Sequence, residues 1–265
     1  MEIHDAVKNL KLYLFDMDGT LYLGDQLFGF TKELLLKIRQ KGGRYMFMTN
    51  NSSKSVQAYV DKLGSLGIEA IYEDFITSSQ ATAYYLKKNH PNDVLYVCGT
   101  NSLKQELVGQ GFRITEDLNE VTCIVMGFDT ELNFKKLRDV SYLLCTRELP
   151  YIATNPDYVC PTEFGSVPDC GSVCDMIFNA TGKRPVVIGK PEPLMPILAM
   201  EQWGYGPEET VVIGDRIYTD IKSGIRAGVV TILVMSGETT ENILNASPDK
   251  PDMVLKDAGE ILKAL

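Results

Sequence analysis

The sequence lacks any apolar run long enough to cross a bilayer. A transmembrane helix needs roughly 18 to 20 consecutive apolar residues, and the longest candidate here is the short stretch Val229–Met235. The N-terminal stretch MEIHDAVKNL carries acidic side chains early and has no apolar centre of the kind found in a secretory signal peptide. We therefore expect no membrane partner and a cytoplasmic location.

Positive charge is also scarce. The chain has 265 residues, with 26 Lys and Arg against 35 Asp and Glu, and its formal net charge is -9. A general nucleic-acid-binding protein needs a basic face to neutralise phosphates, so the charge balance argues against a nucleic-acid partner. An anionic substrate would be held by local cationic groups and not by the overall field of the protein.

Both flanks of the chain lack cysteine, since all six cysteines fall in its middle. Without an export signal, buried and reduced thiols are expected here, and not disulfides. A zinc site formed by Cys160, Cys170 and Cys174 is the alternative, although the two histidines, His4 and His90, lie far from them in the sequence. The clustering indicates that the middle of the chain is organised separately, and a redox or metal role of its thiols stays open.

Strands and helices alternate along the whole chain. Apolar runs alternate with amphipathic stretches that end at Gly or Pro, and this βαβ pattern predicts an α/β fold with a doubly wound parallel sheet. Residues 156–172 show neither pattern and are expected to be irregular. The main strands are expected at residues 10–16, 44–50, 75–79, 93–99, 122–129, 150–155, 209–215 and 229–235.

The alternation restarts after Pro91, which indicates a second unit inside the first. A chain of this length forms either one large α/β domain or two domains with separate cores. We expect a core domain of residues 1–91 and 185–265 and an inserted α/β domain of residues 92–184. Because the insertion lies between the chemical motifs described below, it is expected to close over them and to select the substrate.

Two aspartates end the first predicted strand, in LYLFDMDGTLY. The carboxylates of Asp16 and Asp18 would repel each other unless a cation or a proton lay between them. In an open parallel sheet, ligands gather at the carboxyl ends of the strands. The polar residues at the other strand ends, together with a lysine that precedes a helix, are Thr49, Asn50, Asp215 and Lys190.

These residue types predict phosphoryl transfer assisted by Mg²⁺. Carboxylate oxygens without nitrogen or sulfur ligands select a hard cation such as Mg²⁺, which also binds substrate phosphates. One carboxylate of the Asp16 and Asp18 pair can attack phosphorus to form an aspartyl-phosphate, and the other can serve as general acid and base.

Five motifs occur in a characteristic order: DMDGT from Asp16, TNNSS from Thr49, ATNPD from Ala153, GKPEP from Gly189 and VVIGDRIYTDI from Val211. In these motifs the sequence resembles the haloacid-dehalogenase-like superfamily of phosphohydrolases, and within it the NagD-like or 4-nitrophenylphosphatase-like group. The resemblance covers nearly the whole chain. It implies a Rossmann-like catalytic core with an inserted α/β cap.

The resemblance also implies roles for individual residues. Asp16 would be the nucleophile and Asp18 the general acid and base. Thr49 and Lys190, with Asn50, would bind the phosphoryl group. Asp16, the backbone carbonyl of Asp18 and Asp215 would ligate Mg²⁺, with Asp220 supporting them from behind. The implied reaction is the hydrolysis of a small phosphorylated metabolite, such as a sugar phosphate or a nucleotide.

Other classes of protein fit the sequence less well or stay open. A nicotinamide dehydrogenase would place a glycine-rich turn directly after its first strand, whereas WGYGPEE precedes a strand here. A phosphomutase of the same fold and a non-catalytic module that senses phosphorylated metabolites stay open. The sequence does not decide the oligomeric state, of which a homodimer is one possibility.

Two places in the expected cap could contact the substrate. Asn155 and Asp157, in ATNPDYV, are candidates for the leaving group, the alternative being an Asx turn around Pro156 without ligand contact. The group often has a run of small residues after the position of Pro168, where this chain has PDCGSVCDM. Asp169 and Cys170 could therefore alter substrate preference, or they could only start the following helix.

Overall fold

The structure, a computed structural model, describes residues 9–265 and divides into two compact units. The interpretation of the N-terminal residues as lacking an export signal falls largely on residues 1–8, which lie outside the described residues. The first unit comprises the chain up to Thr49, Val60–Ile76 and Lys190–Leu265, and the second comprises Asn50–Tyr59 and Thr77–Gly189. The expected fold class is confirmed. The expected boundaries of the inserted domain, residues 92 and 184, stay a prediction. The second unit extends beyond both of these residues.

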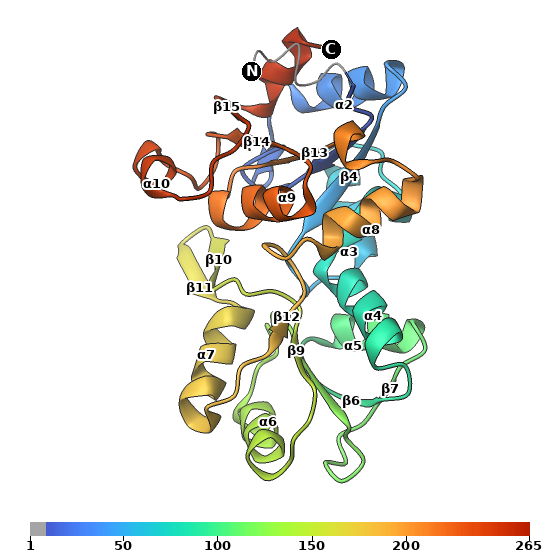
Figure 1. Cartoon of the computed structure of the whole chain (residues 1–265), viewed down its shortest axis with the longest axis vertical. Coiled ribbons are helices and arrows are strands. Elements are labelled where there is room, and N and C mark those ends of the chain that lie inside the picture. Colours follow the sequence, from blue (N-terminus) through green and yellow to red (C-terminus); the bar gives the residue numbers. More distant parts are fainter. Residues whose placement is uncertain (1–8) are drawn as a thin grey trace. The chain divides into compact units, whose positions relative to one another are not determined.

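The first unit contains a six-stranded sheet in the order β15-β14-β13-β1-β4-β5 (Figure 1). Its central strand β1 pairs in parallel with both β13 and β4. The chain therefore builds the sheet outward from β1 on one side and from β13 on the other, which places the topological switch point between these two strands. The strands are β1 (Leu12–Phe15), β4 (Arg44–Thr49), β5 (Phe75–Thr77), β13 (Thr210–Gly214), β14 (Val230–Val234) and β15 (Met253–Leu255).

Burial explains why these segments form strands. Every residue of β1 and of β13 is buried, and continuous apolar runs are typical of parallel strands that are covered on both faces. Helix α2 (Thr31–Gln40) packs against β4, while α9 (Lys222–Ala227) packs against β13 and β14. Helix α8 (Leu194–Trp203) packs against α9. Two further helices are α10 (Glu241–Ala246) and α3 (Val56–Ser65), and the division between the two units falls within α3.

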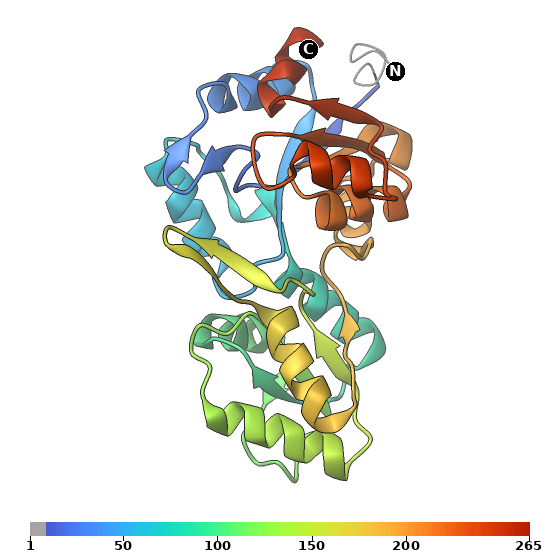
Figure 2. The same ribbon diagram turned by 90° about the vertical axis from the view of Figure 1, so that its left-hand side faces the viewer.

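The second unit has its own parallel sheet, in the order β12-β9-β8-β6-β7. Helices α6 and α7 pack together and enclose a core with this sheet (Figure 2), to which Tyr96, Ile124, Leu143 and Ile177 contribute. The strands are β6 (Val94–Cys98), β7 (Arg113–Ile114), β8 (Cys123–Met126), β9 (Tyr151–Ala153) and β12 (Val186–Val187). The helices are α4 (Ser78–Asn89), α5 (Asn101–Gly109), α6 (Phe134–Thr146) and α7 (Cys170–Thr181).

Two short hairpins were not expected. Residues 156–172 were predicted to be irregular, which is wrong, because β10 (Val159–Thr162) and β11 (Gly165–Pro168) pair there in antiparallel fashion. Pro161 and Pro168 obscured these strands, since proline lacks a backbone donor and is tolerated only in an edge strand of this kind. In the first unit, β2 (Tyr22–Leu23) and β3 (Gln26–Leu27) form a hairpin soon after β1.

The cysteines agree only in part with the expectation of buried thiols. Cys98, Cys123, Cys170 and Cys174 are buried, whereas Cys145 on α6 is exposed, so the expectation is wrong for that residue. Within residues 9–265, no helix combines the length and the apolar character that a membrane span requires.

Candidate active site

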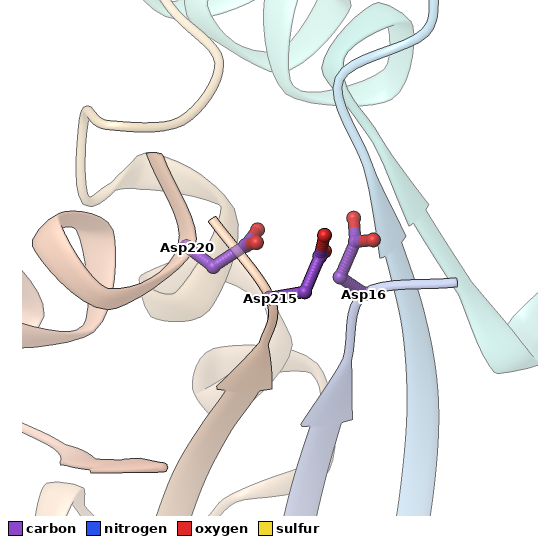
Figure 3. Close-up of side chains that lie close together, drawn as sticks. All are labelled: Asp16, Asp215 and Asp220. Atoms are coloured by element: carbon purple, nitrogen blue, oxygen red, sulfur yellow. The ribbon is translucent and has the colours of Figure 1, made fainter. Parts of the chain in front are cut away.

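Three aspartates of the first unit converge at the switch point of its sheet. Asp16 directly follows β1, and Asp215 directly follows the neighbouring strand β13. Asp220 lies five residues further along the chain, and its carboxylate points toward the other two (Figure 3). One oxygen from each carboxylate lies within 4.8 Å of the others. Asp16 and Asp215, which were predicted to follow strands at one edge of the sheet, thus lie together at one site.

Asp220 reaches the site from an unusual turn. Residues Ile217–Ile221 form one turn of π-helix, a wider helical turn that is frequent at functional sites. The side chain of Asp220 is fully buried and accepts a hydrogen bond from the backbone N–H of Arg216 at 3.1 Å. The turn therefore folds the carboxylate back toward the end of β13.

Lys190 joins two of these carboxylates. Its Nζ donates to Asp16 Oδ1 at 2.7 Å, to Asp220 Oδ1 at 2.5 Å and to the carbonyl oxygen of Met48 at 3.1 Å. The ammonium group is buried, and burial alone would lower its pKa, but Asp16 and Asp220 together raise the pKa of Lys190 above its ordinary value. Lys190 is therefore a fixed positive charge beside Asp16, and its role as a phosphate ligand stays a prediction.

Asp215 has a strongly perturbed environment. Its Oδ2 accepts a hydrogen bond from the backbone N–H of Glu238 at 2.6 Å, while its buried Oδ1 has no hydrogen-bond partner within residues 9–265. Burial, and then the nearby carboxylates of Asp16 and Asp220, raise the pKa of Asp215 to about 8. Burial also raises the pKa of Asp220 to about 6, against the opposing effect of Lys190.

These features fit a hard divalent cation. Several carboxylates close together and a buried oxygen without a partner form a donor set of the kind that Mg²⁺ prefers. Both oxygens of Asp220 already accept hydrogen bonds, from Lys190 and from the backbone of Arg216, which suits a supporting position better than direct ligation. The zinc alternative of Cys160, Cys170 and Cys174 does not form a potential metal-binding group among the described residues.

Asp18 lies apart from this acidic group. It is exposed at the base of the hairpin β2–β3, and its Oδ1 accepts a hydrogen bond from the backbone N–H of Gly24 at 3.4 Å. Partial desolvation raises the pKa of Asp18, opposed by that hydrogen bond and by the charge of Lys62. A carboxyl group with a raised pKa is suited to proton transfer.

Gly19, with φ +84°, is required here because a Cβ would lie 2.6 Å from Asp215 Oδ2.

The other predicted phosphate ligands lie at the end of β4. Thr49 is its last residue and is buried, and Asn50 follows it at the start of the second unit. The side-chain N–H groups of Asn50 donate to both oxygens of Asp157, at 3.2 and 3.1 Å. Asp157 therefore lies against a predicted phosphate ligand, an arrangement that was not foreseen. The roles of Asn50 and Asp157 stay predictions.

Asn155 belongs to the same polar region of the second unit. Its side chain has 0% exposure, donates to Asp169 Oδ1 at 3.0 Å and accepts from Thr154 Oγ1 at 2.9 Å. Asp169 is also the N-cap of α7, which begins at Cys170. These two residues therefore start the helix, which was one of the two interpretations of their sequence. The contact of Asn155 with a leaving group stays a prediction, and its burial favours a structural role.

A segment that the sequence did not reveal as functional encloses Asp215. Ser236 Oγ donates to the carbonyl oxygen of Gly19 at 2.6 Å, and the backbone N–H of Thr239 donates to the carbonyl oxygen of Asp215 at 3.2 Å. The available signal was its position, since Ser236 and Gly237 follow β14 at the same edge of the sheet as Asp16 and Asp215. We call residues 236–239 the β14 loop.

Comparison with known proteins identifies the family of the chain. Residues 13–113 match the family model of the haloacid dehalogenase-like hydrolases, and residues 187–261 match a second model, described as HAD-hydrolase-like. An acid sugar phosphatase of Staphylococcus aureus (strain USA300) is 33% identical over 259 residues, which cover 98% of this chain and 99% of that protein.

Two solved structures of this family are similar to the chain over nearly their whole length. The 4-nitrophenylphosphatase of Thermotoga maritima superimposes with a TM-score of 0.92 at 38% identity, over 100% of this chain and 99% of that one. A nagD-type protein gives a TM-score of 0.89 at 36% identity, over 96% and 98% of the two chains.

The fold and the family matches thus define a hydrolase of the α/β class. More particularly, the chain belongs to the haloacid dehalogenase-like hydrolases. The resemblance to the NagD-like and 4-nitrophenylphosphatase-like group is confirmed, and with it the expectation that the protein is a phosphatase of this family.

Proposed function

We propose that the protein hydrolyses small phosphate monoesters, with sugar phosphates foremost, in a Mg²⁺-dependent reaction through an aspartyl-phosphate on Asp16. The observation that carries this proposal is the buried ammonium group of Lys190, 2.7 Å from Asp16 Oδ1 at the switch point of the sheet. The acid sugar phosphatase and 4-nitrophenylphosphatase that resemble the chain support the choice of substrate class.

The first half of the reaction forms the covalent intermediate. A carboxylate oxygen of Asp16 attacks phosphorus, and the bond between phosphorus and the ester oxygen breaks. The leaving oxygen takes a proton from the carboxyl group of Asp18, whose raised pKa favours the protonated form needed for this step. An alcohol leaves, and the phosphoryl group stays on Asp16.

The second half returns the enzyme to its starting state. The carboxylate of Asp18 takes a proton from a water molecule, whose oxygen attacks phosphorus. The bond between phosphorus and Asp16 breaks, inorganic phosphate leaves, and Asp16 is again a carboxylate. Asp16 and Asp18 both return to their starting forms, and one water molecule is consumed for each ester hydrolysed.

Positive charge near Asp16 lowers the barrier for both halves. Lys190, whose Nζ lies 2.7 Å from Asp16 Oδ1, can stabilise the charge on the transferring phosphoryl oxygens. Thr49 and Asn50 would add hydrogen bonds to the same oxygens. Asp16, the backbone carbonyl of Asp18 and Asp215 would hold Mg²⁺, with Asp220 behind them, and the bound ion would supply further positive charge to the phosphate.

The test is a screen of the purified protein, with Mg²⁺, against phosphorylated sugars, nucleotides and 4-nitrophenyl phosphate. Release of inorganic phosphate is expected from a subset of the metabolites and from the aryl ester. Isomerised product without phosphate release would indicate a phosphomutase, and binding without turnover a sensing module. The cytoplasmic location and the oligomeric state stay predictions.

A further inference from the structure

The β14 loop holds Asp215 through its backbone. The N–H of Glu238 donates to Asp215 Oδ2 at 2.6 Å, and the N–H of Thr239 donates to the carbonyl oxygen of the same residue at 3.2 Å. Gly237 lies so close that a Cβ would be 2.0 Å from Asp215 Oδ2. The position of the loop therefore determines the orientation of the Asp215 carboxylate, because one of its oxygens is fixed and the other, Oδ1, is left for a cation.

The side chain of Glu238 ties this loop to the segment that follows β13. Its Oε2 lies 2.8 Å from Arg216 Nε, and its Oε1 accepts a hydrogen bond from the hydroxyl group of Tyr218. Arg216 and Tyr218 flank the start of the π-helical turn that carries Asp220. One carboxylate thus links the loop that orients Asp215 to the turn that presents Asp220.

The burial pattern separates this link from the core of the unit. The side chain of Glu238 is 35% exposed, whereas Asp215 and Asp220 are buried. An ion pair between partly exposed side chains contributes little to global stability. The link is therefore expected to affect local geometry much more than the fold.

We propose that Glu238 is a positioning residue for the metal site: its side chain anchors the β14 loop so that the backbone N–H of residue 238 holds Asp215 Oδ2 and leaves Oδ1 to the cation. The inference rests on the proposed Mg²⁺ site. It assigns Glu238 no contact with the substrate. Groups behind metal ligands commonly change metal affinity by about 10- to 100-fold when they are removed.

The experiment measures cation binding directly, with Mn²⁺ as a paramagnetic probe titrated into the purified protein and free Mn²⁺ followed by electron paramagnetic resonance. Glu238→Ala is expected to weaken Mn²⁺ binding about tenfold. Glu241→Ala, which removes an exposed acid of α10 from the same part of the chain, is the matched control and should bind Mn²⁺ like the wild type.

Two further variants separate positioning from simple charge. Glu238→Gln removes the charge but keeps one acceptor oxygen for the Arg216 guanidinium, and its new amide N–H groups can donate to the hydroxyl oxygen of Tyr218. It should therefore stay within about threefold of the wild type if the link matters, and fall as far as Glu238→Ala if only the charge matters. Tyr218→Phe removes one anchor without any change of charge. It should weaken Mn²⁺ binding, and its effect should not add to that of Glu238→Ala, because the two side chains act through one hydrogen bond.

The outcomes are distinguishable. Equal Mn²⁺ affinity of the wild type and Glu238→Ala overturns the positioning role but leaves the proposed function intact, and so does equal weakening in Glu238→Gln and Glu238→Ala. A wild-type protein that binds no Mn²⁺ overturns the metal site of the proposed function and this inference with it. A loss in Glu238→Ala that Glu238→Gln restores, with melting temperatures unchanged, supports the role.

Discussion

Lys190 Nζ lies 2.7 Å from Asp16 Oδ1, although 174 residues separate the two in the sequence. The same ammonium group lies 2.5 Å from Asp220 Oδ1, so one cation neutralises part of an acidic cluster that also includes Asp215. When all four groups are ionised, three negative charges and one positive charge leave a net charge of -2. A divalent cation would neutralise this net charge, which is how the buried carboxylates can coexist.

Lys190→Met should unfold more easily than the wild type and should lose turnover. The change leaves Asp16 and Asp220 without their buried cation, and breaking a buried ion pair by removing one partner typically costs about 3 to 5 kcal/mol. Urea denaturation in the presence of a chelator measures this difference. Lys41→Met, at an exposed lysine of the same unit, is the control. Equal stability of the two variants would contradict the structural importance of the Lys190 contacts.

Asp16→Asn should abolish turnover and leave the fold intact. The amide keeps the volume of the side chain but lacks the nucleophilic oxygen, and loss of a nucleophile can cost about 10⁶-fold in rate. Phosphate release from 4-nitrophenyl phosphate measures the effect, and circular dichroism checks the fold. Asp25→Asn, whose side chain is 91% exposed, serves as the matched control. Activity of Asp16→Asn within tenfold of the wild type would end the aspartyl-phosphate mechanism.

Much of this site could be predicted from the sequence, since it depends on local order. Asp16 and Asp215 each follow an apolar run, and parallel strands bring such ends to one edge of a sheet. Lys190 was a candidate from its place ahead of a predicted helix, and the resemblance then implied its role in binding the phosphoryl group, although a lysine before a proline has no periodic signal. The contact of Glu238 with Arg216 was not predictable, since it forms between loops after two different strands.

The local irregularities were missed for a related reason. The π-helical turn at Ile217–Ile221 continues into α9, so its sequence reads as one ordinary helix. Hairpin β10–β11 has strands too short and too rich in proline to show a clear alternation. Both features depend on contacts within the folded unit more than on residue preferences.

Metal removal should make stability depend on pH in a characteristic direction. The pKa of Asp215 is raised to about 8, mainly by burial, and a carboxyl group whose pKa is higher in the folded state binds a proton more tightly there than in the unfolded chain. Its contribution to stability is therefore present at low pH and is lost as pH rises from the unfolded value of about 4 to about 8. Asp220, with its pKa raised to about 6, acts in the same direction.

The melting temperature of the chelated protein should accordingly fall between about pH 5 and pH 8, and Mg²⁺ should raise it most at the upper end, because a cation binds only the ionised carboxylate. Asp215→Asn cannot titrate at this position and should show a shallower fall. Ca²⁺ should restore activity poorly after chelation, since its larger and looser coordination shell misplaces the attacking carboxylate. Full activity after exhaustive chelation would refute the metal dependence.

Gly237→Ala should impair the site through sterics alone. The added Cβ would lie 2.0 Å from Asp215 Oδ2 and 2.5 Å from its Cγ, so the aspartate or the β14 loop must shift. A displacement of about 1 Å in a catalytic site can cost about 100-fold in rate, and kcat for 4-nitrophenyl phosphate is the measurement. Gly29→Ala, where a Cβ would meet nothing within 4 Å, is the control. Similar kcat values for both variants would show that the close approach is not needed.

Asn155 and Asp157 should differ in what their removal does. Asn155→Ala removes a fully buried amide and leaves Asp169 Oδ1 without that donor, so it should lower the free energy of unfolding by about 1 to 3 kcal/mol and leave the order of preferred substrates unchanged. Asp157→Ala removes the two carboxylate oxygens that accept hydrogen bonds from the side-chain amide of Asn50. If Asn50 binds the phosphoryl group, as the sequence predicts, every ester should be hydrolysed more slowly by a similar factor of about ten.

The measurement for this pair is kcat/KM for several phosphorylated metabolites and for 4-nitrophenyl phosphate, alongside urea denaturation. Asp157→Asn is the matched variant, because it keeps one acceptor for the Asn50 amide and should recover part of the rate. If Asp157→Ala instead changes the order of the metabolites while the aryl ester is hydrolysed normally, Asp157 contacts the leaving group. In that case Asp157, with its hydrogen bonds to Asn50, would belong to the residues of the second unit that select the substrate and not to those that bind the phosphoryl group.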